Sequence, residues 1–307
     1  MQPKLILKEI ANTIHNSKDR YTAHEKVKKY FEELCSDMKF IHRALKDCIV
    51  DPKFLNNADN LFFYLLVEGD VMIAINLFPP IYDREKNITH DNIHHHGWRL
   101  LTTGVISGNG YETINFVKKS HEKVENNEVK LEIKSMYRHE LGGSKFIDSD
   151  QAHVVFHPEA TTATLALWSA NKQLRNQKIK KMLKNFPNIR KFITTMTHKL
   201  QINQILGLNQ IKGVYFHPEN GKIVETKNYT KPFDGPVEEI VPCMFKFFQQ
   251  IKLNDSSFFL KIKEFLNPKY KHLCDKLIAN ETIPDLEIKG NIRRRFSKDQ
   301  ILKAINN

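Results

Sequence analysis

The spacing of hydrophobic positions divides the chain into three stretches. Apolar residues recur every three or four positions over 3–16 and 23–48, the pattern of helices that bury one face. From about residue 60 to 170, short apolar runs alternate with turn residues, which predicts a sandwich or small barrel of strands. Helical spacing returns after Asn171, interrupted by an isolated hairpin that we expect at 214–226.

The expected strands are short and lie between turn residues such as Gly, Asn and Pro. They span 61–67, 71–78, 93–97, 100–106, 111–117, 129–138, 152–156 and 162–169. Later helices are expected at 174–186, 188–206, 236–252, 256–266, 268–280 and 297–305. We therefore expect an N-terminal helical segment (1–58), a barrel (59–170) and a basic, mostly helical region (171–307) that packs on the barrel.

Composition indicates a globular chain of 307 residues with an ordinary hydrophobic fraction of 41%. The longest apolar stretch is cut by Glu68 and Asp70, well short of the roughly 20 residues that a bilayer span needs. Residues 1–20 lack the apolar core of a signal peptide. The four cysteines are scattered and show no paired zinc spacing. We expect a cytoplasmic protein that does not associate with membranes.

The net charge of +12 is unevenly distributed. Residues 171–307 carry 26 Lys and Arg against 12 Asp and Glu, whereas the rest of the chain carries 21 against 23. Such a basic region is either a solvated helical surface or a surface that attracts nucleic acid or another polyanion. We expect the solvated surface, because the sequence shows no motif that reads bases, and keep nucleic-acid binding as the alternative.

Three consecutive histidines, His94, His95 and His96, are the first candidate for chemistry. On a strand, side chains alternate between faces, so His94 and His96 point the same way with Cα atoms about 6.6 Å apart. Two imidazoles at that spacing can converge on one metal ion at about 2.1 Å each. His153, near the end of the β-rich stretch, would supply a third imidazole if strand pairing brings it beside them. Three ligands leave coordination positions open for a substrate and for oxygen or water.

These residues resemble the cupin superfamily and, within it, the cysteine dioxygenase-like (thiol dioxygenase) group. The usual first cupin motif is His-x-His, then Glu, then Gly; here Leu101 stands in the place of the Glu and Gly108 follows in register. Cysteine dioxygenases also lack that Glu and use three histidines. The segment 107–114 is similar to their Gly-Asn-x-x-Glu-Thr stretch, and 147–153 is similar to their second motif. The resemblance covers roughly residues 88–170.

The resemblance implies a mainly β core, a cupin double-stranded β-helix (jelly roll), with N-terminal helices and a C-terminal helical region. It implies one metal ion held by His94, His96 and His153, with Fe(II) expected and Zn, Ni or Mn as alternatives. The implied function is a mononuclear non-heme iron oxygenase or dioxygenase that uses O2 on a small organic substrate, such as a thiol. Two other functions stay open: a non-redox lyase or isomerase, and a ligand-sensing cupin with a nucleic-acid-binding basic region.

Four further residues are candidates for binding the substrate or for supporting the metal ligands: His157, Arg99, Tyr111 and Trp168. His157 has the parity of His153, but Pro158 follows it and tends to end strand pairing. We therefore assign His153 to the metal and His157 to hydrogen bonding at the barrel rim. Trp168 lies on the strand where cysteine dioxygenases carry Ser-x-His-x-Tyr, which this chain replaces by Thr164, Ala166 and Trp168.

Overall fold

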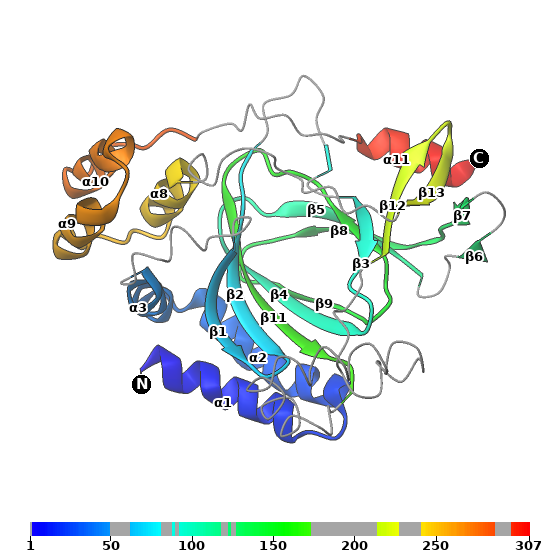
Figure 1. Cartoon of the computed structure of the whole chain (residues 1–307), viewed down its shortest axis with the longest axis horizontal. Helices are drawn as coiled ribbons and strands as arrows, with labels where there is room; N and C mark the ends of the chain where they lie inside the picture. The colour runs from blue at the N-terminus through cyan, green and yellow to red at the C-terminus, as the bar shows by residue number, and fades with distance from the viewer. Residues whose placement is uncertain are drawn as a thin grey trace, which may run out of the picture.

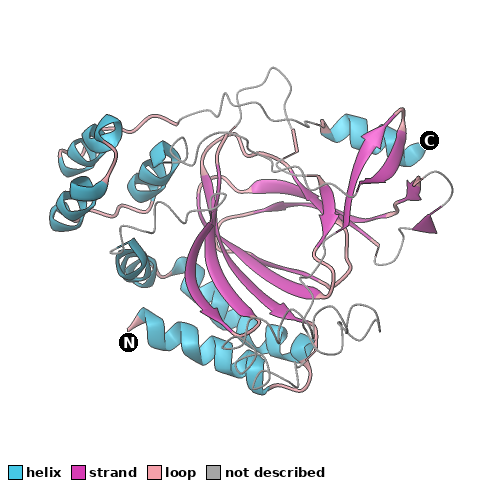
Figure 2. Cartoon of the chain, viewed as in Figure 1, coloured by secondary structure: helices cyan, strands magenta, loops and turns pink. Residues whose placement is uncertain are grey.

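The computed structural model describes residues 2–49, 62–80, 88–89, 92–117, 122–123, 127–172, 214–226, 241–285 and 296–307. The helices expected at 174–186 and 188–206 lie outside these residues. In the described part, a core of two sheets is flanked by helices from both ends of the chain (Figures 1 and 2). None of the described helices is long and apolar enough to cross a membrane. All four cysteines are free thiols.

Three helices precede the sheets: α1 (Pro3–Asn16), α2 (Arg20–Ser36) and α3 (Met38–Ile49). The single helix predicted over 23–48 was wrong, because the chain breaks at Asp37. The Asp37 carboxylate accepts a hydrogen bond from the backbone N–H of Phe40 at 3.0 Å and so caps the start of α3. Both helices bury apolar faces in the same cluster, so the helical spacing of apolar residues continues across the break.

The strands form two antiparallel sheets. The first has the order β1-β2-β11-β4-β9 and is built from β1 (Phe62–Glu68), β2 (Val71–Phe78), β11 (Thr162–Ala170), β4 (Arg99–Ser107) and β9 (Ser144–Ile147). The second has the order β13-β12-β3-β10-β5-β8 and is built from β13 (Lys222–Thr226), β12 (Val214–Glu219), β3 (Ile93–His95), β10 (His153–Val155), β5 (Tyr111–Phe116) and β8 (Ile133–His139). Strands β6 (Glu122–Lys123) and β7 (Val129–Lys130) form a separate small ribbon, which contacts β13 of the second sheet.

Eight of these strands pair in a nested order. Strand β2 pairs with β11, β3 with β10, β4 with β9 and β5 with β8, always antiparallel. Each pair lies inside the previous pair along the sequence, and successive pairs alternate between the two sheets. This order is that of a jelly roll, so the core is the cupin-like β core that the sequence predicted.

Three predictions at the sheet edges were wrong. The strand expected over 129–138 is divided into β7 and β8, because a bulge at Asn115/Phe116 shifts the register of β5 against β8 and β7 pairs with β6. Strand β9 was not predicted at all. The hairpin at 214–226 is not isolated, since β12 extends the second sheet beside β3, with Tyr215 opposite His94.

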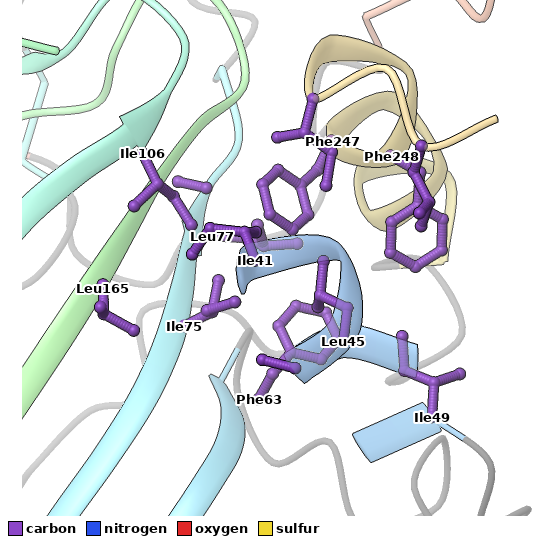
Figure 3. Packing of buried hydrophobic residues seen from close by; sticks show 14 of the residues in the cluster. Ile41, Leu45, Ile49, Phe63, Ile75, Leu77, Ile106, Leu165, Phe247 and Phe248 are labelled. Carbon is purple, nitrogen blue, oxygen red and sulfur yellow. The ribbon is translucent and has the colours of Figure 1, made fainter. Parts of the chain in front are cut away.

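Helices cover the outer faces of both sheets. The N-terminal helices pack on the first sheet, α1 against β1 and β2, α3 against β1, and α2 against β4 and β11. Helix α8 (Val241–Gln250) joins the same hydrophobic cluster, and α9 (Ser256–Phe265) and α10 (Lys271–Ile278), which follows a short 3₁₀ turn at Pro268–Tyr270, pack against α8. Figure 3 shows Phe247 and Phe248 of α8 beside α3 and Leu77 of β2. Helix α11 (Lys298–Asn306) packs on the second sheet through Ile301. The inner faces of the two sheets are therefore left for the candidate site.

Candidate metal centre

Three histidines from two neighbouring strands meet on the inner face of the second sheet. His94 of β3 lies directly opposite His153 of β10 in the strand register, and His96 follows β3. The ring centroids are 4.6 Å apart for His94 and His96, 4.5 Å for His94 and His153, and 4.9 Å for His96 and His153. One ring nitrogen from each lies within 4.8 Å of the other two. This group can hold a metal ion.

Backbone carbonyls orient two of these rings. Nδ1 of His94 lies 2.8 Å from the carbonyl oxygen of Asn92, and Nδ1 of His153 lies 3.3 Å from that of Gln151. A carbonyl oxygen only accepts, so each Nδ1 carries the proton and donates it. The lone pair of each ring is then on Nε2, and a carbonyl that fixes the tautomer in this way is typical of metal-binding histidines.

Burial keeps two of these imidazoles, His96 and His153, neutral. His153 is 2% exposed and His94 is 9% exposed. Burial, followed by the neighbouring imidazoles, lowers the pKa of His96 well below 6.5, and burial followed by His94 does the same for His153. A metal ion binds the neutral form of imidazole, so at neutral pH these two ligands need not lose a proton first.

The middle histidine of the run serves the turn that follows β3. Nδ1 of His95 accepts a hydrogen bond from the backbone N–H of Gly97 at 3.0 Å, and Gly97 has a positive φ of 59°. The His95 ring lies 6.2 Å from the ring of Phe216, which belongs to the cluster on the outer face of the second sheet. The alternation of a strand therefore separates His95 from the other two histidines.

The structure places the four supporting candidates in different surroundings. The Trp168 ring contacts His96 edge to face, with centroids 4.4 Å apart. His157 does not join the three-histidine group; its Nδ1 donates to the carbonyl oxygen of Pro79 at 2.9 Å. Arg99 is partly exposed at the start of β4, and burial lowers its pKa. Tyr111 is buried against Phe78 and its hydroxyl lies 3.0 Å from Nδ1 of His139, away from the three histidines.

Apolar residues of the first sheet face the three histidines. Leu101, Ile147, Ala166 and Trp168 form one cluster on its inner face. Leu101 occupies the position at which the usual cupin motif has a Glu, and no carboxylate joins the three-histidine group among the described residues. A metal ion there would keep open coordination positions in water-excluding surroundings.

Sequence reasoning missed several polar residues on the inner faces. Asn115 lies opposite His153, and Thr113 lies opposite Tyr137. The Asn115 and Thr113 side chains are buried beside the Tyr137 phenol. Lys145 of β9 reaches over the Tyr137 ring, with Nζ 4.8 Å from its centroid. Strand alternation along β8 and β9 is the signal that would have placed Tyr137 and Lys145 inside, but β9 itself was not predicted.

A separate cavity of about 160 Å³ lies beside α11, lined by Glu112, Met136, Arg138 and Lys298 together with neighbours on β5 and β8. The Lys298 ammonium and the Glu112 carboxylate form an ion pair of 2.7 Å at its wall. None of the three histidines lines this cavity, so it is distinct from the candidate metal centre.

No known family model and no curated protein matches this chain. A solved structure of the DMSP lyases RdDddP and RnDddQII aligns with it at 15% identity over 36% of this chain and 46% of that one, with a TM-score of 0.25. A protein with a double-stranded beta-helix domain from Klebsiella pneumoniae aligns at 13% identity over 38% and 80%, with a TM-score of 0.24. A cupin protein from Bacteroides fragilis aligns at 15% identity over 34% and 68%, with a TM-score of 0.23. The chain thus spans less than half of the first of these structures. At such TM-scores, the nested strand order defines the fold and the likeness adds nothing to it.

Proposed function

We propose that this protein is a mononuclear non-heme Fe(II) oxygenase of the cupin type, which uses O2 on a small organic substrate such as a thiol. The observation that supports it most is the group of His94, His96 and His153, whose ligating nitrogens lie within 4.8 Å of one another. Imidazole is a good ligand for Fe(II) and also for Zn and Ni, so the metal remains part of the proposal.

The donor set fits such a metal. Two of the rings present Nε2 to the metal because backbone carbonyls accept hydrogen bonds from their Nδ1–H groups. Leu101 stands where the usual cupin motif has a Glu, so no carboxylate at that position offsets the charge of the metal. Three neutral ligands leave the full charge of a divalent ion and several open positions. When bound, Fe(II) would supply the redox chemistry with O2, while the protein orients the substrate.

The chain's own residues would hold the substrate and exclude water. Trp168 and Leu101 form an apolar wall beside His96, which limits the access of water to that side. In the facing second sheet, Asn115 lies opposite His153 in the strand register, and its amide oxygen is buried. One apolar wall and one polar wall would orient a small molecule that carries both kinds of surface.

The competing proposal is a non-redox lyase or isomerase at the same centre, and the inner-face groups argue against it. Such an enzyme needs a base poised near neutral pH. Burial raises the pKa of Tyr137, so its phenol stays protonated. Burial lowers the pKa of His139 to about 4, and its Nε2–H donates to the carbonyl oxygen of Gly143 at 3.0 Å. Neither of these two groups is a ready base, so a lyase or isomerase would depend on another base, such as a water on the metal.

Oxygen dependence tests the proposal. Untagged protein, purified without oxygen and loaded with Fe(II), is offered thiols and other small chelating molecules while an electrode records O2. We expect O2 uptake that requires both Fe(II) and one class of substrate and that is lost in H153A. The control is H157A, which changes a histidine of the barrel outside the three-histidine group. Turnover of a substrate by Zn-loaded protein without O2 would favour the lyase or isomerase instead.

A further inference from the structure

Lys145 lies on the inner face of the first sheet. It pairs with Thr103 in the register of β9 and β4, two residues from the pair of Ile147 and Leu101. Ile147 and Leu101 belong to the inner cluster that includes Trp168, and residues two apart on a strand share a face. Ser144, the neighbour of Lys145, points the other way, since its hydroxyl donates to the Glu32 carboxylate of α2 at 2.6 Å.

This lysine has no acidic partner. Among the described residues its contact is the ring of Tyr137, 4.8 Å from Nζ, and no carboxylate forms an ion pair with it. The Lys145 side chain is half-buried, so water can reach its ammonium, and a carboxylate could take the place of that water. Thr113, which pairs with Tyr137, adds a buried hydroxyl beside the phenol. Three polar groups therefore face one another with nothing of opposite charge among them.

The register places these groups beside the metal centre. In the first sheet, Trp168 contacts His96 and lies opposite Leu101 on β4. Leu101 in turn lies opposite Ile147 on β9, and Lys145 is two residues from Ile147 on the same strand. In the second sheet, Asn115 pairs with His153, and Thr113 lies two residues along β5. Two residues of strand span about 7 Å. Both sheets thus bring Lys145 and Tyr137 within the length of a small molecule of the three histidines.

We propose that the Lys145 ammonium, together with the hydroxyls of Tyr137 and Thr113, binds the carboxylate of the substrate. This inference rests on the proposed metal centre and names the substrate class: a short acid whose other end, two or three atoms away, faces the metal. An ammonium is a compact point charge with three donors, which suits a carboxylate that also accepts from hydroxyls. Beyond this level, Phe78, Val105 and Tyr111 fill the inner faces as an apolar cluster, so a long chain would not fit in that direction.

The test compares an acid with its uncharged amide. Co(II)-loaded protein, whose absorption spectrum reports ligands of the metal, is titrated with 3-mercaptopropanoate and with 3-mercaptopropanamide. Wild type should bind the acid more tightly, and K145M should lose about 10- to 100-fold of the affinity for the acid and little for the amide, because a hydrogen bond between charged groups is lost. K145R should keep the preference for the acid. The matched control is K134M, which changes an exposed lysine on the outer face of β8.

A second measurement separates this inference from the metal centre. Propanoate binding to metal-free protein in EDTA is followed by saturation-transfer NMR, with a signal expected in wild type and K145R and lost in K145M. Equal binding of acid and amide by wild type, or an acid affinity unchanged in K145M, would overturn the carboxylate site while leaving the metal centre standing. A propanoate signal that depends on Lys145 in a protein that fails to bind Co(II) would support the carboxylate site and refute the proposed function.

Discussion

His24 makes the fold sensitive to acid. It lies on α2, 1% exposed, and its ring joins the helix to two strands: Nδ1 is 2.8 Å from Thr102 Oγ1 on β4, and Nε2 is 2.9 Å from Ser169 Oγ on β11. The Ser169 hydroxyl donates to the carbonyl oxygen of Ala170, so Nε2 carries the proton and Nδ1 accepts from Thr102. A second proton on the ring would break this arrangement.

Burial, and then the nearby charge of Arg20, lowers the pKa of His24 from 6.5 to about 4. The folded state therefore binds this proton less readily than the unfolded state, and stability falls as the pH decreases. The contribution is complete above pH 6.5, declines through the window down to about 4, and is absent below it. At about 1.4 kcal/mol for each pH unit, the total is about 3 kcal/mol.

The assay is urea unfolding of metal-free protein, followed by tryptophan fluorescence at several pH values between 4 and 7.5. H24Q keeps a donor and an acceptor but cannot be charged, so wild type should lose about 3 kcal/mol more than H24Q between pH 6.5 and 4. H272Q, which changes an exposed histidine of α10, should behave like wild type. Equal pH dependence in wild type and H24Q would show that the buried ring does not titrate as its surroundings require.

Three further outcomes are expected. H153A should lose most bound metal while H157A, measured by the same elemental analysis, keeps it, because only the first lies in the three-histidine group. G110A should lower the free energy of unfolding, measured in urea, by about 1–3 kcal/mol or more. The reason is that Gly110 has a φ of +72° and that an added Cβ would lie 1.9 Å from the carbonyl oxygen of His139. The control G143A, where an added Cβ would lie 3.4 Å from its nearest neighbour, should be close to wild type. F247A should lower the free energy of unfolding by about 3–5 kcal/mol, because α8 is buried against α3 and β2. For the same reason, limited proteolysis of the wild type should not quickly release a barrel that ends near residue 170. A stable F247A protein would contradict that packing.

The β core could be predicted because its strands either alternate apolar and polar residues or are apolar throughout, and because clear turn residues separate them. The strands around His94 and His153 show both signals, and the resemblance to cupins indicated how they pair. The pairing of His94 with His153 in the structure agrees with that register. Sequence patterns of this kind report burial on one or both faces, which is what a jelly-roll strand must satisfy.

The sheet edges and the polar inner residues could not be predicted for a physical reason. Strand β9 is four residues long and carries Lys145 inside, so its pattern of polar and apolar residues resembles a loop. The break at Asp37 depends on one side chain that caps α3, while the apolar spacing runs on. Strand β12 pairs through its backbone with β3, more than a hundred residues earlier, and nothing local indicates that partner. Thus cross-strand partners, not periodicity, decide which polar residues meet.

The nested strand order also affects how a metal ion would act on folding. His94 and His153 belong to one pair of strands, β3 and β10, and the whole of β4, β5, β8 and β9 lies between them along the chain. An ion held by these histidines ties the two ends of that long segment together in the folded barrel, so the outer strand pairs cannot open unless a histidine leaves the ion. The innermost hairpin, β5 and β8, can form without the ion, whereas the outer pairs gain from it. We therefore expect metal loading to slow unfolding more than it speeds folding, so that loss of the ion would shorten the lifetime of the folded barrel.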